Sequence, residues 1–347
     1  MGARIIGTGG YLPKRILTND AIEPETTFDR VARCGRSLDE WAREHHGGVT
    51  RHIAEPGEAT ASLAVEAAKL ALSDAGTEID SVDLIVLATF TGDYRLPQAA
   101  GVMQAALGSR AKFIQLDSAC TGFLDGLMVA NGLMQTQGYK RALVASADVT
   151  SMLNRPSDFL TRTVFGDGAG AIILDAGNDD DYGIRSFSCG SDGDLGRYVY
   201  APGGGSKYPA SHETLDQGLQ YWRFDFSAIA KWAVDRMILA TREVLDKARL
   251  TIDQIDLIVP HQASLKIIQQ FAAAVNYPVD RIATTYPRFG NISGASIPVA
   301  LDHARRERTL KTGDWLLMPA VGAGMAWGAV AYRWVEPGGR GMPHARP

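Results

Sequence analysis

The chain has few cysteines and no metal-binding spacing. Three cysteines occur among its 347 residues, an odd number that is too small and too scattered for a disulfide framework. Neither a Cys-x-x-Cys pair nor a His-x-x-x-His pair is present, so no metal site is predicted. A reducing compartment is therefore expected.

Strong net charge and long apolar runs are also missing. Lys and Arg number 35 against 39 Asp and Glu, which gives a net charge of −4 and no clustered basic surface for a polyanion. No apolar run approaches the roughly 20 residues that span a membrane, and the N-terminal sequence MGARIIGTGGYLP lacks a signal-peptide pattern. A cytoplasmic protein with no nucleic-acid or membrane partner is expected.

Glycine is plentiful, with 37 residues, but the phosphate-binding patterns that use it are absent. The segment GDGAG at 166–170 lacks the Lys-Ser/Thr of a P-loop, and no Gly-x-Gly-x-x-Gly motif follows a strand-like run. These glycines are interpreted as positions of close packing in the core. No cofactor is predicted.

The sequence does contain an internal repeat. IDSVDLIV at 79–86 returns as IDQIDLIV at 252–259, which is 173 residues further along, and a helix-like segment precedes each copy. The strand-like KRALVASA at 140–147 has a counterpart at 313–320, at the same offset. Chance is a poor explanation for two matches at one offset, so two copies of one α/β unit are expected.

Short, nearly continuous apolar strands such as LIVLATF alternate with helical patterns in each copy. This alternation is typical of sheets covered by helices on both faces, so a layered α/β protein with pseudo-two-fold symmetry is predicted. The N-terminal half is placed at 1–178, the C-terminal half at 179–335 and a flexible tail at 336–347. Because ligands of α/β proteins bind near strand ends, chemistry is expected where the halves meet.

Cys120 follows a strand-like run and begins a helix-like segment in QLDSACTGFLDGL at 115–127. Two interpretations stay open on local grounds. A thiol at a helix N-terminus lies near unpaired N–H groups and the positive end of the helix dipole, which would stabilise a nucleophilic thiolate. Cysteine is also among the most buried residue types, so this side chain could simply fill a tight turn.

Two polar residues occupy comparable places in the second half. His261 ends the strand-like DLIVP at 256–260, and Asn291 stands in the small-residue segment RFGNISGAS at 288–296, before a helix-like run. Asn291 lies 171 residues after Cys120, close to the offset of the repeat. Taken singly, His261 could be a structural histidine and Asn291 a helix cap. Their positions in a duplicated architecture favour a site shared with Cys120.

Seven segments of the chain, taken together, are more specific. They are IIGTGGYLP at 5–13, DEWAREHHGGVTRHIA at 39–54, DSACTGF at 117–123, FGDGAGA at 165–171, PHQASLKII at 260–268, GNISGASIPVAL at 290–301 and GAGMAWGA at 322–329. In content and order they resemble the β-ketoacyl-acyl carrier protein synthase III branch of the thiolase-like condensing enzymes. The resemblance implies a homodimer of thiolase-like fold, layered α/β/α/β/α, and a Cys-His-Asn triad that falls on Cys120, His261 and Asn291.

The resemblance also implies a reaction. Cys120 would take an acyl group from a thioester of coenzyme A or acyl carrier protein, and would condense it with a malonyl-type or β-ketoacyl thioester, the malonyl type losing carbon dioxide. His261 and Asn291 would donate hydrogen bonds to the enolate oxygen. The backbone N–H groups of Cys120 and Ala323 would hold the oxygen of the acyl group.

Two residues are assigned to the carrier arm by the same resemblance. Trp41 matches the family's adenine-stacking tryptophan. Lys266 stands where an arginine commonly contacts the pantetheine or the carrier, although it could also be a solvated helix lysine. His45 and Asp158 replace arginines that usually flank the adenine, which makes the coenzyme A site atypical.

Three residues are expected to shape the acyl pocket. Val321 stands where the family usually has a phenylalanine beside the malonyl site. The segment TGDYRLP at 91–97 matches a loop that reaches into the partner's pocket in the family dimer, with Leu96 at the pocket floor. Arg95 could meet a substrate carboxylate or lie at the dimer rim. The insertion at 197–222 is interpreted as a mobile cover.

The sequence therefore predicts a homodimeric condensing acyltransferase of a specialised fatty-acid or polyketide and secondary-metabolite pathway. The nearest alternative is transfer of the acyl group from Cys120 to a hydroxyl or amine without decarboxylation. An alternative of another class is a silent partner subunit that binds a carrier protein, although the retained triad disfavours it.

Overall fold

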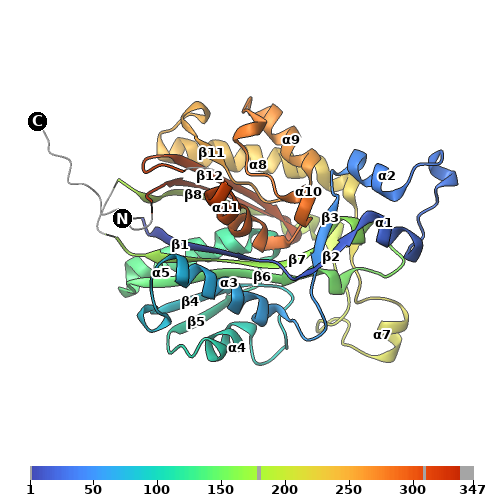
Figure 1. Ribbon diagram of the computed structural model, residues 1–347, viewed down its shortest axis with the longest axis horizontal. Helices are drawn as coiled ribbons and strands as arrows, with labels where there is room; N and C mark the ends of the chain where they lie inside the picture. The colour runs from blue at the N-terminus through green and yellow to red at the C-terminus, as the bar shows by residue number, and fades with distance from the viewer. Residues whose placement is uncertain (1, 178–180, 308–309, 337–347) are drawn as a thin grey trace, which may run out of the picture.

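Two β-sheets with the same strand arrangement form the centre of the molecule (Figure 1). The computed structural model describes residues 2–177, 181–307 and 310–336. The N-terminal sheet has the order β1-β7-β6-β4-β5 and the C-terminal sheet the order β11-β12-β13-β8. Their bounds are β1 (Arg4–Tyr11), β4 (Leu84–Ala88), β5 (Lys112–Leu116), β6 (Arg141–Val149), β7 (Asp167–Asp175), β8 (Gly183–Ser191), β11 (Leu257–Ile258), β12 (Trp315–Gly322) and β13 (Ala326–Arg333).

Strand order shows how the two copies correspond. Along the chain β8, β11, β12 and β13 take the places of β1, β4, β6 and β7. The counterpart of β5 is reduced to a single bridge between Ile258 and Ile282. The duplicated, layered α/β fold predicted from the repeat is thus confirmed, with one shortened edge.

Helices cover both sheets and fill the space between them (Figure 1). α3 and α4 pack on the outer face of the N-terminal sheet, α5 and α11 lie between the sheets, and α8 and α9 cover the outer face of the C-terminal sheet. Their bounds are α3 (Thr60–Asp74), α4 (Ala99–Ala106), α5 (Gly122–Gln137), α8 (Phe226–Ala248), α9 (Leu265–Ala274) and α11 (Ser296–Glu307). This is the expected α/β/α/β/α layering.

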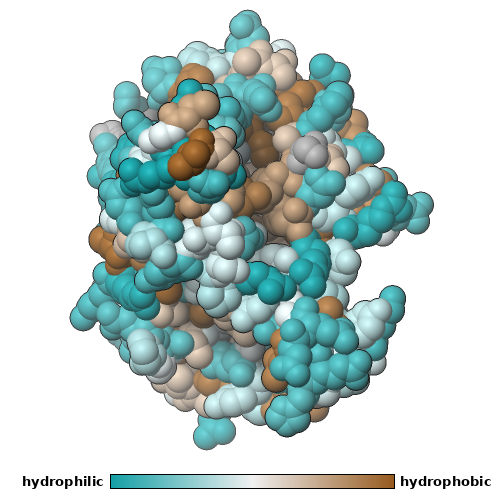
Figure 2. All heavy atoms as spheres, turned by 90° about the vertical axis from the view of Figure 1, so that its right-hand side faces the viewer, coloured by the Kyte–Doolittle hydropathy of each residue, from teal (hydrophilic) through white to brown (hydrophobic). Residues whose placement is uncertain are grey.

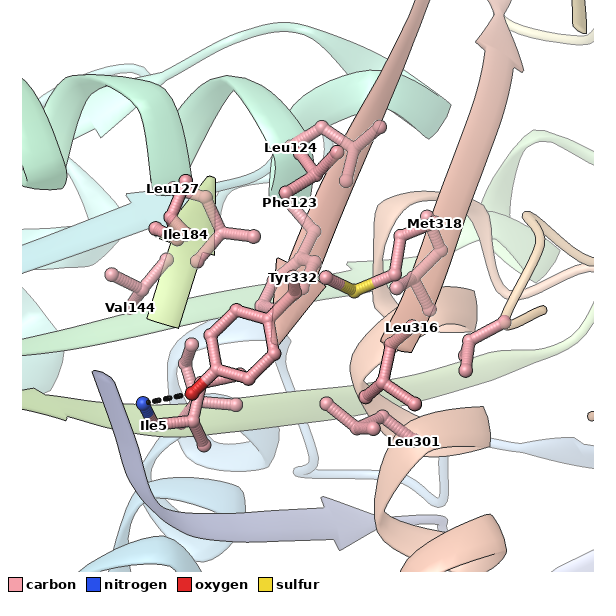
Figure 3. Packing of buried hydrophobic residues seen from close by; sticks show 14 of the residues in the cluster. Ile5, Phe123, Leu124, Leu127, Val144, Ile184, Leu301, Leu316, Met318 and Tyr332 are labelled. Carbon is pink, nitrogen blue, oxygen red and sulfur yellow. Dashed lines mark hydrogen bonds between the residues drawn. The ribbon is translucent and has the colours of Figure 1, made fainter. Parts of the chain in front are cut away.

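One shared core joins the two halves. Its buried side chains come from β1, α5 and β6 of the first half and from α11, β12 and β13 of the second. Within it the Ile5 N–H of β1 donates to the Tyr332 hydroxyl of β13 at 2.7 Å (Figure 3). Close packing also needs small residues, since a Cβ atom at Gly9 would lie 2.3 Å from the Ala67 carbonyl oxygen of α3. The halves therefore form one folding unit.

Shorter elements surround one end of the strands, on the right in Figure 1. They are β2 (Arg15–Thr18), α1 (Asn19–Ile22), α2 (Leu38–His45), β3 (Thr50–Ile53), α6 (Phe159–Val164), β9 (Val199–Tyr200), α7 (His212–Asp216), β10 (Arg223–Phe224) and α10 (Tyr286–Phe289). Across the described ranges, no helix combines the length and the apolar character needed to cross a membrane.

The predicted boundary between the halves, at 178/179, lies outside the described residues. It is bracketed by the end of β7 at Asp175 and the start of β8 at Gly183. The predicted tail at 336–347 likewise lies outside them, apart from its first residue.

Candidate active site

The Cys120 turn connects β5 to α5. A single 3₁₀ turn, η4 (Ala119–Thr121), precedes the first residue of α5, Gly122. Ala119 adopts φ = 43°, in the left-handed region that is uncommon for residues other than glycine. The Cys120 side chain is left half-buried on the wall of a pocket. A constrained turn, and not a regular helix start, therefore presents the thiol.

The electrostatic environment of this thiol differs from the sequence expectation. Burial raises the pKa of Cys120 to about 11, although the Ser293 hydroxyl and the backbone N–H groups of Ala323 and Cys120 favour the thiolate. Desolvation outweighs the hydrogen bonds that the turn donates to the sulfur, because the thiolate loses more hydration on burial than these few donors replace. The thiol is therefore protonated at neutral pH, so a nucleophilic role needs a proton acceptor.

The two predicted oxyanion donors meet at one sulfur. Ala323 begins the turn η10 (Ala323–Met325), and its N–H acts on the Cys120 sulfur together with the N–H of Cys120 itself. Glycine favours close packing just before this turn, because a Cβ atom at Gly322 would lie 3.1 Å from the Cys120 Cβ, a tight contact. The end of β12 thus packs directly on the nucleophile turn.

Asn291 lies just before a second turn, η9 (Ser293–Ala295), which leads into α11. Its N–H donates to the Val164 carbonyl oxygen at 2.8 Å, and its own carbonyl oxygen accepts from the Gly166 N–H at 3.0 Å. Its side-chain oxygen Oδ1 accepts from the Ser293 N–H at 2.9 Å. The side-chain NH₂ of Asn291 is the group that remains to bind a ligand.

The structure refines the match between the two turns. In the second turn Ser293 has φ = 52° and takes the place of Ala119, so Asn291 precedes the position equivalent to Cys120 by three residues. Ser293 was not predicted as a site residue, yet its hydroxyl lies 3.7 Å from the Cys120 Sγ. Ser293 lies 173 residues after Cys120, at the offset of the sequence repeat, which was the signal that could have found it, although the two turns themselves match at an offset of 293 − 119 = 174.

His261 follows β11 and is fixed by its backbone, since its N–H donates to the Pro319 carbonyl oxygen of β12 at 2.9 Å. Burial lowers the pKa of its imidazole to about 3, with a small opposing contribution from the Ser293 backbone. The ring is therefore neutral at physiological pH. A neutral imidazole offers one N–H donor and one acceptor nitrogen.

One pocket brings most of the predicted residues together. It has a volume of ≈ 230 Å³. On the face of the molecule that carries α2 and α7, apolar side chains gather in a recess between hydrophilic lobes (Figure 2). From the sequence prediction the pocket is lined by Cys120, His261, Asn291, Lys266, Val321 and Ala323.

Aromatic rings that the sequence did not single out form much of the pocket wall. The Phe165 and Trp222 rings stack with centroids 5.1 Å apart and an interplanar angle of 17°. Phe90 and Phe224 pack around this pair, at 5.8 Å from Trp222 and 5.7 Å from Phe165. The insertion at 197–222, expected to cover the site, contributes Trp222 to the wall. The aromatic sequence QYWRFDF at 220–226, which begins at the end of this insertion, was the available signal.

Trp41 is not among the residues that line the pocket. Its ring stacks on His45, with centroids 4.2 Å apart and an interplanar angle of 18°, and Phe159 packs edge-on at 5.1 Å. Asp158 accepts the Leu160 N–H at 3.0 Å and caps α6. His45 and Asp158, which depart from the family pattern, thus have local structural roles. His45 covers one face of the Trp41 ring.

Arg95 and Leu96 do not reach the pocket of their own chain. Both are exposed, Leu96 at 83% of its surface. A leucine this exposed fits the predicted insertion into a partner's pocket, which a single chain does not display.

The fold and this arrangement define a condensing acyltransferase of the thiolase-like class. The model of 3-oxoacyl-[acyl-carrier-protein (ACP)] synthase III matches residues 114–193, and the model of its C-terminal part matches residues 245–334. The chain is 38% identical to the β-ketoacyl-[acyl-carrier-protein] synthase III of Caldanaerobacter subterraneus over 335 residues, which are 96% of this chain and 98% of that protein.

Solved structures agree. The 3-oxoacyl-(acyl carrier protein) synthase III from Pseudomonas aeruginosa superposes with a TM-score of 0.87 at 34% identity, covering 97% of this chain and 99% of that one. The priming β-ketosynthase of the R1128 polyketide biosynthetic pathway gives 0.86 at 26% identity, covering 97% of each chain. The chain belongs to the β-ketoacyl-[acyl-carrier-protein] synthase III family.

Proposed function

We propose that this condensing enzyme forms an acyl thioester on Cys120 and joins that acyl group to a malonyl-type or β-ketoacyl thioester. The observation that carries the proposal is the convergence of Cys120, His261 and Asn291 on one pocket from three separate loops. The N–H groups of Cys120 and Ala323 act on the sulfur, which supports a role for them as donors to the oxygen of an acyl group bound to it.

The second half-reaction needs neutral hydrogen-bond donors for an enolate oxygen. The low pKa of His261 keeps its imidazole neutral, and the NH₂ of Asn291 carries no charge. Each donor of this kind is worth roughly 3 kcal/mol of barrier. Both side chains can therefore stabilise the negative charge that develops on the enolate oxygen as carbon dioxide leaves. Neither of them is charged before the reaction.

The acyl group is proposed to be apolar, because aromatic rings and aliphatic side chains form most of the wall beside Cys120. Val321, which lines the pocket, is smaller than the phenylalanine that the family resemblance implies at this position. The likeness to a priming enzyme of a polyketide pathway supports a specialised pathway over general fatty-acid initiation. The family's proteins are named for acyl carrier protein substrates, which favours the same class of carrier here.

A carrier protein also fits the outer part of the site better than free coenzyme A does. Since His45 covers one face of Trp41, adenine could stack there only after His45 moved. Lys266 is exposed in the first turn of α9 and lines the pocket, so it can meet the phosphate of a pantetheine arm from either carrier. A homodimer, with Leu96 inserted into the partner, completes the proposal.

Release of labelled carbon dioxide tests the condensation. The protein is supplied with an acyl thioester and carboxyl-labelled malonyl-acyl carrier protein. We expect release that depends on both substrates, and we expect Asn291→Ala to lower it by about 10²-fold or more while Cys120 is still acylated. Turnover of Asn291→Ala at the wild-type rate, without carbon dioxide, would instead establish acyl transfer to another acceptor.

A further inference from the structure

A second carboxyl group lies buried behind the nucleophile. Asp148, at the end of β6, is fully buried. Its Oδ1 accepts from the Thr89 hydroxyl at 2.9 Å, the Phe90 N–H at 3.1 Å and the Thr91 hydroxyl at 3.0 Å. Its Oδ2 is buried and has no hydrogen-bond partner among the described residues. One oxygen is thus tethered, and the other is free to accept a proton.

Ser293 connects this carboxyl group to the thiol. The Ser293 hydroxyl lies 3.7 Å from the Cys120 Sγ. It makes no hydrogen bond to either Asp148 oxygen in this structure, but it is near enough to lower the pKa of that carboxyl group. The turn packs tightly on β6, since a Cβ atom at Gly294 would lie 2.4 Å from the Ser146 Oγ. A serine hydroxyl can donate one hydrogen bond while it accepts another, so Ser293 can pass a proton between the two groups when its side chain turns toward Asp148.

We propose that Asp148 accepts the thiol proton of Cys120 through the hydroxyl of Ser293. The inference rests on the proposed acylation of Cys120 and says how that thiol is activated. Asp148 touches no substrate atom and acts through Ser293, so it is a positioning residue.

The proton balance closes over one cycle. The Cys120 proton moves to Ser293 Oγ as the Ser293 proton moves to the carboxyl group of Asp148, and the sulfur electron pair forms the bond to the acyl carbon. The bond between that carbon and the carrier sulfur breaks, and the departing thiolate takes a proton from solvent. When the acyl group later leaves Cys120, the released thiolate regains the stored proton through Ser293.

The local charges suit this role. Burial raises the pKa of Asp148 to about 7, which makes it a stronger base than an ordinary carboxylate while leaving it largely ionised at pH 8. From the turn packed against β6, the Cys120 thiol is the titratable group that interacts with it. Asp167 of the adjacent strand β7 binds Ser151 and the Ala54 N–H instead, and Asp93, on the loop beyond Thr91, binds the Ala61 N–H.

A purely electrostatic role for Asp148 predicts the opposite effect of its removal on the reactivity of Cys120. The negative charge of Asp148 raises the pKa of Cys120. If charge were its whole effect, Asp148→Asn would lower that pKa and make the thiol more reactive. As a proton acceptor, Asp148 makes the thiol more reactive, so the same substitution slows it.

Alkylation of Cys120 by iodoacetamide separates the two roles without any thioester substrate. The rate is followed from pH 5 to pH 10 by peptide mass spectrometry, which distinguishes Cys120 from Cys34 and Cys189. Asp148→Asn keeps an oxygen for Thr89, Phe90 and Thr91. Ser293→Ala keeps a small side chain in a conformation that Ala119 already adopts in the equivalent turn. Asp167→Asn is the matched control, a buried aspartate that does not contact Ser293.

We expect the wild-type rate to rise through a step near the pKa of Asp148, about pH 7. Asp148→Asn and Ser293→Ala should each remove this step and slow alkylation at pH 8 by about 10²-fold, and the double variant should be no slower than either. Asp167→Asn should retain the step. Faster alkylation in Asp148→Asn, or additive losses in the double variant, would overturn the relay while leaving acylation of Cys120 intact.

Discussion

The ring of Trp222 should set how long an acyl chain Cys120 accepts. Its indole lies on Phe165 with centroids 5.1 Å apart and closes one wall of a pocket of ≈ 230 Å³. Trp222→Ala removes that wall. Each further methylene that enters the opened space is worth about 0.8 kcal/mol, or about fourfold in the rate of acylation at low substrate concentration. The preferred chain should therefore lengthen by several carbons.

The assay is competition among straight-chain thioesters of two to twelve carbons, read from the relative masses of acylated protein. Trp222→Phe is the graded control, because a smaller ring can still stack on Phe165 and should shift the preference less. Thermal unfolding of each variant shows whether the wall has collapsed. An unchanged chain-length profile in folded Trp222→Ala would refute the assignment of this wall to the acyl group.

Two further predictions concern stability. Tyr332→Phe leaves the buried Ile5 N–H without its acceptor, so the free energy of unfolding measured in urea should fall by about 1–3 kcal/mol; an unchanged midpoint would contradict the importance of this link between the halves. Because the pKa of Asp148 rises from 3.8 to about 7 on folding, the folded chain binds more protons between these values, and its stability should fall as the pH rises through that window. Asp148→Asn should flatten this pH dependence. Equal slopes for the wild-type protein and the variant would show that Asp148 does not cause it.

The sequence was a good guide to features that depend on the backbone. The repeat at 79–86 and 252–259 predicted two related sheets, because each copy must bury the same apolar strand between helices. It also located the turns that carry Cys120 and Asn291. These positions follow from chain periodicity, which the sequence displays directly.

Features that depend on packing were harder to predict. The high pKa of Cys120 arises from burial, and the elements packed on its turn, β12 and η9, are far away in sequence. Local sequence therefore left the choice between a buried thiol and an activated one open. Trp222 reaches the pocket through the path of the insertion, and Asp148 lies near the nucleophile because the turn η9 packs against β6. Leu96 and Arg95 depend on a second chain, and their assignment remains a prediction.

Exposing the protein to a panel of acyl thioesters and weighing it intact tests the central claim most directly. The account predicts a mass increase of one acyl group, mapped to Cys120, that is lost in Cys120→Ala and reversed by hydroxylamine. An intact wild-type protein that gains no adduct from any coenzyme A or acyl carrier protein thioester, or that gains it equally in Cys120→Ala, would contradict it.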